Sequence, residues 1–399
     1  MCPFFYRTID MQYDFFSPQQ IHFGWGRFAE VGQLASSLGT RGLIISGSRS
    51  LEAKGVLEEL QQFLSRANIS SEFIHTITNE PEVTDVDQVT QLLRDAGIRA
   101  GDFLIGIGGG SGIDLAKACA AMVTNQESDT VLDYLEGVGR GLKLTQTPLP
   151  LLAIPTTAGT GSEATKNAVI SSYSPAFKKS LRADQMIPNL VLCDPQLACS
   201  VPPEVTARTG MDAITQLLES YISCRAQPIP QALCLQGLKL ALPAITEAVE
   251  NGTSRTGREN MAHASLLSGI ALANSGLGMA HGVAPALGIH CRIPHGLACA
   301  VMLPATLKTN LSVCQREYAE ITRFIAPDLS LSEAEADQYL IDRIQSLNDR
   351  LKIPRRLSDL GVTPSQIPDL VASSRGNSMS GNPREISDTE LTQILEDLL

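Results

Sequence analysis

Two histidines, His281 and His295, are each followed directly by glycine and are two of only six histidines in the chain. The small residue after each one leaves the imidazole accessible. Pro285, Gly288 and Pro294 lie between them and predict an interruption of any helix, so that the chain folds back and brings the two rings together. Two such imidazoles could bind one metal ion, and zinc and iron suit this donor. The alternative is a pair of ordinary core or loop histidines, because the chain has no HExxH spacing.

A second chemical motif is a glycine-rich turn between an apolar segment, 103–107, and a segment of helical character. Backbone N–H groups in such a turn can approach a pyrophosphate closely, and the partial positive charge of the helix N-terminus favours an anion. Alternatively, a serine and an aspartate three residues apart form only a capping box. Capping leaves three consecutive glycines unexplained, since glycine costs conformational entropy. The predicted phosphate-binding residues are Gly108, Gly109, Gly110, Ser111 and Asp114.

A third motif, residues 154–163, follows another apolar segment and is rich in threonine, serine and glycine. Its hydroxyls and free backbone amides suit a ribose, a nicotinamide amide or a phosphate. Taken alone, it could be an ordinary loop. Two such loops after two strands of one sheet favour a nucleotide, with Thr156, Thr157 and Thr160 as the predicted contacts.

Asp212 and Gln216 lie four residues apart in a helical segment and therefore share one helix face. Each could point an oxygen at one metal ion. In the alternative interpretation Thr209 caps the helix, Asp212 offsets the helix dipole in its first turn, and Gln216 is solvated or hydrogen-bonded.

The elements that must position these residues change character along the chain. Before residue 194, short apolar strands alternate with helices, which predicts a parallel sheet covered on both faces. After residue 202 only helices are predicted. We therefore expect an α/β nucleotide-binding domain over 1–197 and an all-α domain over 198–399. The predicted strands lie within 13–28 and at 42–46, 72–77, 103–107, 151–154, 168–172 and 190–193, and the helices at 51–67, 83–96, 207–224, 232–251, 259–274, 299–310 and 333–351.

Composition limits the classes of partner. The net charge of −11 argues against nucleic acid and anionic membranes. Residues 1–16 do not have the pattern of a secretory signal, and no uninterrupted apolar run reaches the ~18–20 residues that span a bilayer. Nine cysteines without a CxxC motif indicate reduced thiols in a cytoplasmic protein.

The motifs GGGSGIDLAK, IPTTAGTGSE, TGMDAITQLLESY and GLGMAHGVAPALG, followed by PHG, occur in this order. Together the chain resembles the iron-containing (group III) alcohol dehydrogenases, which have the dehydroquinate synthase-like fold. The resemblance implies NAD(P), one divalent metal ion, with Fe(II) favoured over Zn(II), and a cleft between two domains. It also implies hydride transfer between nicotinamide and a small alcohol or aldehyde, and we expect a homodimer.

The resemblance assigns roles to individual residues. Asp212, His281 and His295 match three family metal ligands and act in catalysis through the metal, while Gln216 stands where the fourth ligand is usually histidine. Pro285 stands where many members have another histidine near the substrate. Lys178 matches a lysine that contacts the cofactor in some members.

Cofactor choice depends on residues 47–49. In the family that the chain resembles, the position of Gly47 often carries an aspartate, which binds the ribose hydroxyls and repels a 2′-phosphate. Here Gly47, Ser48 and Arg49 include no acid, and an arginine can bind a phosphate, which predicts that NADP(H) is accepted. Arg49 could instead simply point to solvent.

Three other functions remain open at this point: a lyase such as dehydroquinate synthase, a metal-independent reductase like maleylacetate reductase, and a non-catalytic nucleotide-binding homologue.

Overall fold

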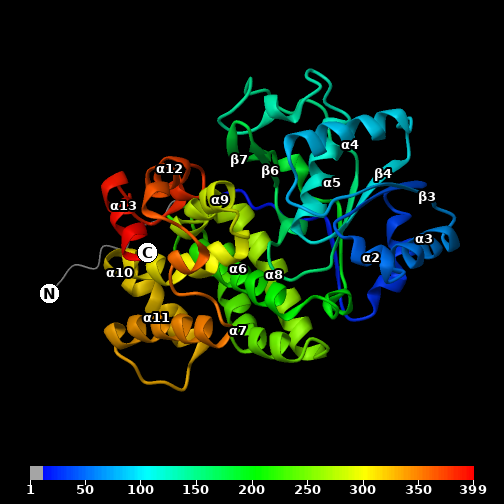
Figure 1. The fold of residues 1–399 in the computed structure, drawn as a ribbon. Coiled ribbons are helices and arrows are strands. Elements are labelled where there is room, and N and C mark those ends of the chain that lie inside the picture. The colour runs from blue at the N-terminus through cyan, green and yellow to red at the C-terminus, as the bar shows by residue number, and fades with distance from the viewer. Residues whose placement is uncertain (1–11) are drawn as a thin grey trace.

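The computed structural model describes residues 12–399. The prediction of no secretory signal therefore falls largely on residues outside this range. The chain forms an N-terminal α/β domain and a C-terminal half made of helices, which lie side by side (Figure 1).

A six-stranded sheet is the centre of the N-terminal domain, and every pair of neighbouring strands in it is parallel. Strands β4 and β5 are buried along their whole length, as expected for a parallel sheet with both faces covered. The spatial order is β1 (Gln20–Phe23), β8 (Leu190–Cys193), β5 (Leu151–Pro155), β4 (Asp102–Gly108), β2 (Arg41–Ser46) and β3 (Ser70–Thr76).

Helices cover both faces of this sheet. Ile44 packs toward one layer, whereas its neighbours Leu43 and Ile45 pack toward the other, because successive side chains of a strand point to opposite faces. The predicted α/β class is confirmed. The first layer contains α1 (Val31–Ala35), α2 (Arg49–Ala53) and α3 (Val56–Arg66), and the second contains α4 (Val83–Asp95) and α5 (Gly110–Met122).

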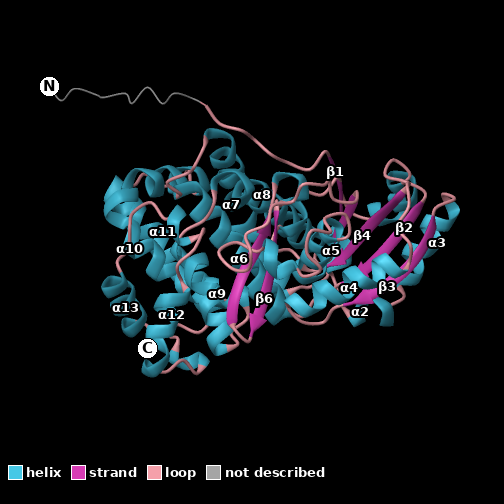
Figure 2. Ribbon diagram, turned by 90° about the horizontal axis from the view of Figure 1, so that it is seen from above, coloured by secondary structure: helices cyan, strands magenta, loops and turns pink. Residues whose placement is uncertain are grey.

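Two predictions for this domain were wrong. The helix expected over 51–67 is two helices, because Gly55 adopts a positive φ of 75° and starts α3 anew. The strand expected at 168–172 does not join the main sheet. It is β6 (Asn167–Tyr173), which pairs antiparallel with β7 (Ala176–Arg182) through a two-residue connection. Figure 2 shows this hairpin between the main sheet and the helical half.

Within the described residues no strand follows β8, as predicted. Helix α6 is the central helix of the C-terminal half, and it packs against α7, α8 and α10. The helices are α6 (Pro203–Ile222), α7 (Pro228–Glu250), α8 (Arg255–Ser275), α9 (Met279–Cys291), α10 (His295–Ile325), α11 (Glu333–Arg350), α12 (Ile367–Ser373) and α13 (Asp388–Asp397).

The break in the histidine segment lies later than predicted. Pro285 and Gly288 are inside α9, and the turn falls at residues 292–294, where Arg292 has a positive φ of 58°. Burial of most of α9 outweighs the local cost of a proline inside the helix. The helix expected over 299–310 is only part of α10, which is 31 residues long.

Two helices, α7 and α10, are long and apolar enough to cross a membrane by length and composition alone. In each, about half of the most apolar window, 50% and 56%, is buried among the other helices. Such burial is typical of core helices in a globular domain. The eight cysteines within 12–399 are free thiols, in agreement with the prediction.

The two halves share a small apolar cluster beside the third sequence motif. Ala164, in the segment after β5, and Val191, on β8, pack against Leu266 and Ile270 of α8. A Cβ atom added to Gly161 would lie 2.5 Å from the Cα of Gly269 in α8, so the loop backbone and the helix are in direct contact.

Candidate active site

Three of the predicted cofactor-binding segments meet at one edge of the sheet. Strand β4 lies between β2 and β5. Gly108 is the last residue of β4, and Gly47 and Thr156 directly follow β2 and β5. The N–H of Gly47 donates to the carbonyl of Ile107 (2.8 Å), and the N–H of Thr156 donates to the carbonyl of Gly108 (2.9 Å). Nucleotides bind in open parallel sheets at this edge.

The glycine turn has the form expected of a phosphate-binding loop. Gly109 is the N-cap of α5, and no side chain hydrogen-bonds to the cap. The predicted alternative, a capping box, is therefore wrong. A Cβ atom on Gly109 would lie 3.2 Å from Thr157 Oγ1, and one on Gly110 would lie 2.7 Å from Thr160, so the glycines lie directly beneath the threonine loop.

Asp114 and Lys117, one helical turn apart in α5, bind the segment that follows the threonine loop. The Asp114 carboxylate accepts hydrogen bonds from the N–H of Val169 (3.0 Å) and from the Ser162 hydroxyl. The fully buried Lys117 ammonium donates to the Ser162 carbonyl (2.8 Å) and to Thr165 Oγ1 (2.7 Å). Burial lowers the pKa of Lys117. Both side chains therefore hold residues 162–169 against α5.

Residues 47–49 link β2 to α2. Ser48 is the N-cap of α2, and its hydroxyl accepts a hydrogen bond from the N–H of Ser50 (3.1 Å). Arg49 begins the helix, and its side chain is exposed beside the nucleotide edge.

A compact cluster of metal-binding side chains lies in the helical half, formed by Asp212, His281, His295 and Cys299. Their ligand atoms lie within 4.8 Å of one another. Asp212 Oδ1 is 3.2 Å from His281 Nε2 and 3.7 Å from His295 Nε2, and Cys299 Sγ is 3.7 Å from the latter atom. Three of the four residues predicted to bind the metal, Asp212, His281 and His295, are thus brought together. The fourth, Gln216, was expected to be a weak or absent ligand, and its amide hydrogen-bonds Ser268 and Thr160.

Three helices and one turn build the cluster. Asp212 lies deep in α6, which begins at Pro203 rather than near residue 209, so the alternative of a first-turn aspartate is wrong. His281 is in the first turn of α9, and His295 is the first residue of α10. A Cβ atom on Gly296 would lie 2.3 Å from the Arg208 carbonyl oxygen, so this glycine lets α10 approach α6.

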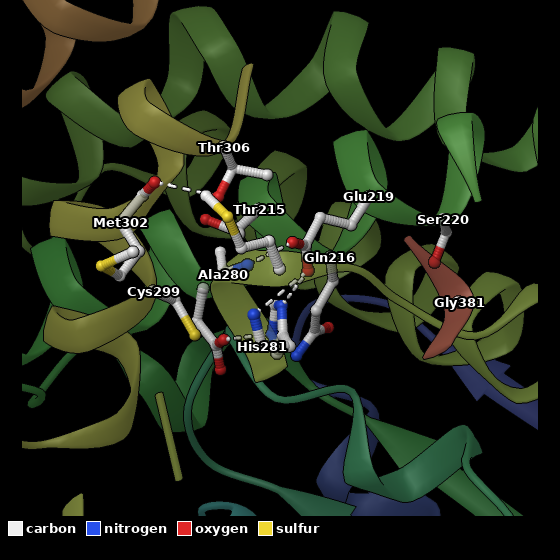
Figure 3. Close-up of polar contacts among 12 residues, drawn as sticks. Thr215, Gln216, Glu219, Ser220, Ala280, His281, Cys299, Met302, Thr306 and Gly381 are labelled. Atoms are coloured by element: carbon white, nitrogen blue, oxygen red, sulfur yellow. Dashed lines mark hydrogen bonds and ion pairs between the residues drawn. The ribbon is translucent and has the colours of Figure 1, made fainter. Parts of the chain in front are cut away.

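Glu219, which was not among the residues predicted for the site, holds His281 in its orientation. Its carboxylate accepts hydrogen bonds from His281 Nδ1 (2.6 Å) and from the backbone N–H groups of Ala280 (2.6 Å) and His281 (3.3 Å). Nε2 of the imidazole is thereby directed toward Asp212. Figure 3 shows the contact between Glu219 and His281. A carboxylate behind a metal-binding histidine fixes its tautomer and ring orientation.

The electrostatics of the cluster favour a cation. Burial lowers the pKa of His281, but Cys299, Asp212 and Glu219 around it outweigh burial and raise that pKa well above its usual value. Burial would raise the pKa of Asp212, but His295 and His281 hold it below its usual value. Burial lowers the pKa of His295 to about 4, so this imidazole is neutral at pH 7. One carboxylate, two imidazoles and a thiol around a buried point are a donor set that fits Fe(II) or Zn(II).

Gln216 connects α6, which carries Asp212, to the threonine loop after β5. Its Oε1 accepts a hydrogen bond from the Ser268 hydroxyl (2.7 Å), and its Nε2 donates to the Thr160 carbonyl (3.3 Å). The same loop is bound to α8, because the N–H of Gly159 donates to Ser265 Oγ (2.7 Å).

Lys178 and Glu80 form an ion pair beside the cluster, with Lys178 Nζ 2.7 Å from Glu80 Oε2. Burial raises the pKa of Glu80, but Lys178 outweighs burial and keeps the pKa below its usual value. The positive charge of Lys178 lowers the pKa of His295, and the negative charge of Glu80 raises it. His290, near the end of α9, hydrogen-bonds Ser373 (2.8 Å).

Comparison with known proteins agrees with this geometry. A family model described as "Iron-containing alcohol dehydrogenase" matches residues 18–195, and one described as "Fe-containing alcohol dehydrogenase family, C-terminal" matches 206–399. The chain is 32% identical to 1,3-propanediol dehydrogenase of Citrobacter freundii, over 96% of this chain and 97% of that protein. It is 30% identical to NADPH-dependent butanol dehydrogenase of Clostridium saccharobutylicum, over 95% of this chain and 96% of that protein. The solved structure of a 1,3-propanediol oxidoreductase superposes with a TM-score of 0.90 at 30% identity, covering 97% of this chain and all of the other.

Proposed function

Because the chain belongs to the family of iron-containing alcohol dehydrogenases, we propose that it interconverts a small alcohol and its aldehyde. The family makes it an oxidoreductase that acts on CH–OH groups with NAD(P) and a divalent metal ion. The observation that carries the proposal is the hydrogen bond between Gln216 and Thr160, which joins the helix of the metal cluster to the nucleotide loop.

Each part of the site has a defined task in this reaction. Asp212, His281 and His295 would hold the metal ion, which supplies a Lewis acid for the oxygen of the substrate. Glu219 keeps Nε2 of His281 directed into the cluster. Gly109 and its neighbours would bind the pyrophosphate. The threonine loop above them, residues 156–160, would orient the nicotinamide ribose.

Helix α9 and the hairpin β6–β7 enclose the other side of the site. A Cβ atom on Gly288 of α9 would lie 3.9 Å from Lys178 Nζ. The Lys178–Glu80 pair therefore lies between the cofactor edge and α9, where it would help to exclude water and set the charge near the substrate.

NADP(H) should be accepted by this protein. Arg49 is exposed at the carboxyl end of β2, and Ser48 beside it carries a hydroxyl rather than an acid. An arginine there can form two hydrogen bonds to a 2′-phosphate.

The division at residue 197, a homodimer and a cytoplasmic location are also proposals. The boundary is supported by the end of the sheet at Cys193 and the start of α6 at Pro203. The free thiols support a reducing compartment. Strand β1 lies at an edge of the sheet with the side chain of Ile21 exposed, which would suit contact with a second copy. Sedimentation velocity would test the homodimer.

The deciding experiment is an assay of purified protein with measured metal content. Aldehyde-dependent oxidation of NADH and NADPH is followed over a panel of aldehydes, before and after removal of metal by a chelator. Activity that is lost with the metal and restored by Fe(II) or Zn(II) supports the proposal. Equal activity without metal would indicate a metal-independent reductase. Cofactor binding without turnover of any aldehyde would indicate a lyase or a non-catalytic homologue.

A further inference from the structure

We propose that Cys299 is the fourth ligand of the divalent metal ion and that Gln216 lies outside the coordination shell. This inference rests on the metal centre of the proposed function and defines its ligands. Neither the histidine spacing nor the resemblance assigns a role to this cysteine.

The spacing of the donor atoms fits a tetrahedral site that includes sulfur. With ordinary zinc bond lengths, a regular tetrahedron has edges of ~3.3 Å between nitrogen or oxygen donors and ~3.6 Å between sulfur and nitrogen. The observed separations are 3.2 Å and 3.7 Å from Asp212 Oδ1 to the two imidazole Nε2 atoms, and 3.7 Å from Cys299 Sγ to His295 Nε2. These three separations are close to the edges of such a tetrahedron, and all four donor atoms lie within 4.8 Å of one another.

The position of Cys299 on its helix explains this closeness. Cys299 follows His295 by four residues in α10, so the two side chains lie on the same helix face. The cysteine is completely buried. Sulfur binds metal as the thiolate, so the thiol proton would be released when the metal–sulfur bond forms.

Gln216 is held by other groups. Its carboxamide oxygen accepts the Ser268 hydroxyl and its nitrogen donates to the Thr160 carbonyl, so both ends of the amide are already paired. In the view of Figure 3, Cys299 and Gln216 lie on opposite sides of His281. An amide oxygen is also a weaker ligand for zinc than a thiolate. The thiolate thus replaces the imidazole that family members place at position 216.

The alternative role for Cys299 is simple packing, because buried cysteines often behave as small apolar residues. Cys314 on the same helix is an example, buried at 2% exposure and outside the metal cluster. It therefore provides a matched control. Catalytic zinc accepts a fifth donor during turnover, so a fourth protein ligand is compatible with the proposed function.

Cobalt substitution tests the assignment directly. Metal-free native protein is titrated with Co(II), and the near-ultraviolet spectrum is examined for a sulfur-to-cobalt charge-transfer band, which nitrogen and oxygen ligands do not produce. The band should appear at one equivalent in the native protein, in Cys314→Ala and in Gln216→Ala. It should be absent from Cys299→Ala and Cys299→Ser.

Metal affinities from chelator competition provide the second measurement. Cys299→Ala should weaken Zn(II) binding by more than the ~10–100-fold typical of lost outer-shell partners. Mn(II) binding should change less, because Mn(II) prefers oxygen donors. Native protein that binds one Co(II) without the band would overturn the role of Cys299, whether or not the variants fold. A larger loss of affinity in Gln216→Ala than in Cys299→Ala would overturn it as well. Native protein that binds neither metal would refute the metal-dependent function itself.

Discussion

Replacing Glu219 with glutamine should weaken metal binding without removing any metal ligand. The native carboxylate is 1% exposed and accepts three hydrogen bonds, two from backbone N–H groups and one from His281 Nδ1. Glutamine has nearly the same volume, but it offers only one acceptor oxygen and a donating amide. One of the native hydrogen bonds must therefore be lost in either orientation of the amide.

The two orientations of the amide have different costs. If its nitrogen faces Nδ1 of His281, the imidazole must carry its proton on Nε2, the atom directed at Asp212, and that atom can no longer bind a metal ion. If the nitrogen faces Ala280 instead, the N–H groups of the glutamine amide and of the Ala280 backbone point at each other, and the Ala280 donor loses its partner. A buried donor without a partner costs about 1–3 kcal/mol of stability.

We expect Glu219→Gln to lower metal affinity about 10–100-fold, the usual effect of losing an outer-shell partner, which corresponds to about 1.4–2.7 kcal/mol. Competition with a chelating dye measures the affinity, and thermal unfolding of metal-free protein measures the separate loss of stability. Glu320→Gln is the control, because Glu320 also accepts a hydrogen bond from an α6 residue, Tyr221 (2.9 Å), and is absent from the metal cluster. A folded Glu219→Gln protein with native metal affinity would show that His281 needs no carboxylate to orient it.

Three further predictions concern the cofactor side of the molecule. Gly109→Val should abolish NAD(P)H binding while the protein stays folded. The fold should tolerate the change because Gly109 has an extended backbone and an added Cβ would meet only Thr157, at 3.2 Å. Fluorescence titration measures cofactor binding and circular dichroism measures folding, and native cofactor affinity in the folded variant would refute the loop assignment. Arg49→Ala should lower kcat/KM for NADPH and leave that for NADH nearly unchanged, and a native enzyme with a strong preference for NADH would contradict this interpretation. Burial raises the pKa of Glu163 from 4.5 to about 7, so its contribution to stability is complete below pH 4.5 and is lost as the pH rises to 7, by up to about 3 kcal/mol. Glu163→Gln should remove this loss, as measured by the free energy of urea unfolding at pH 5 and pH 8. If the free energy of unfolding of the variant changes between the two pH values as much as that of the native protein, Glu163 is already ionised at the lower pH.

The layers of the fold could be predicted because they depend on local patterns, whereas three members of the metal cluster were predicted from the histidine pair together with the family motifs. Apolar strands between helices produce a parallel sheet, and the turn after α9 contains a proline that stops a helix. The hairpin partner β7 was missed, because its sequence AFKKSLR is too polar to be recognised as a strand. Strand β7 packs against α9 and its partner β6 packs against α5, and single-sequence patterns do not report such contacts.

Two residues of the site could have been found from helix faces: Glu219 within the helix expected over 207–224, and Cys299 by extending the helix expected over 299–310 back to His295. Asp212, Gln216 and Glu219 lie at positions i, i+4 and i+7 of α6, and His295 and Cys299 lie four apart in α10. The expected helix began at Cys299, so this second pair was not seen as one face. The partners of Gln216 could not be predicted, because Ser268 and Thr160 reach it from α8 and from the loop after β5.

The contact between the loop after β5 and helix α8 has a consequence for the stability of the whole chain. Gly161 and Gly269 are in backbone contact, and Leu266 and Ile270 share a cluster with strand β8. Separating the halves would expose this cluster and break the buried hydrogen bond of Gly159. Unfolding of either half would remove part of the other's core, so we expect the stabilities of the two halves to be coupled. A substitution that weakens the sheet should then also lower the free energy of unfolding of the metal-binding helices.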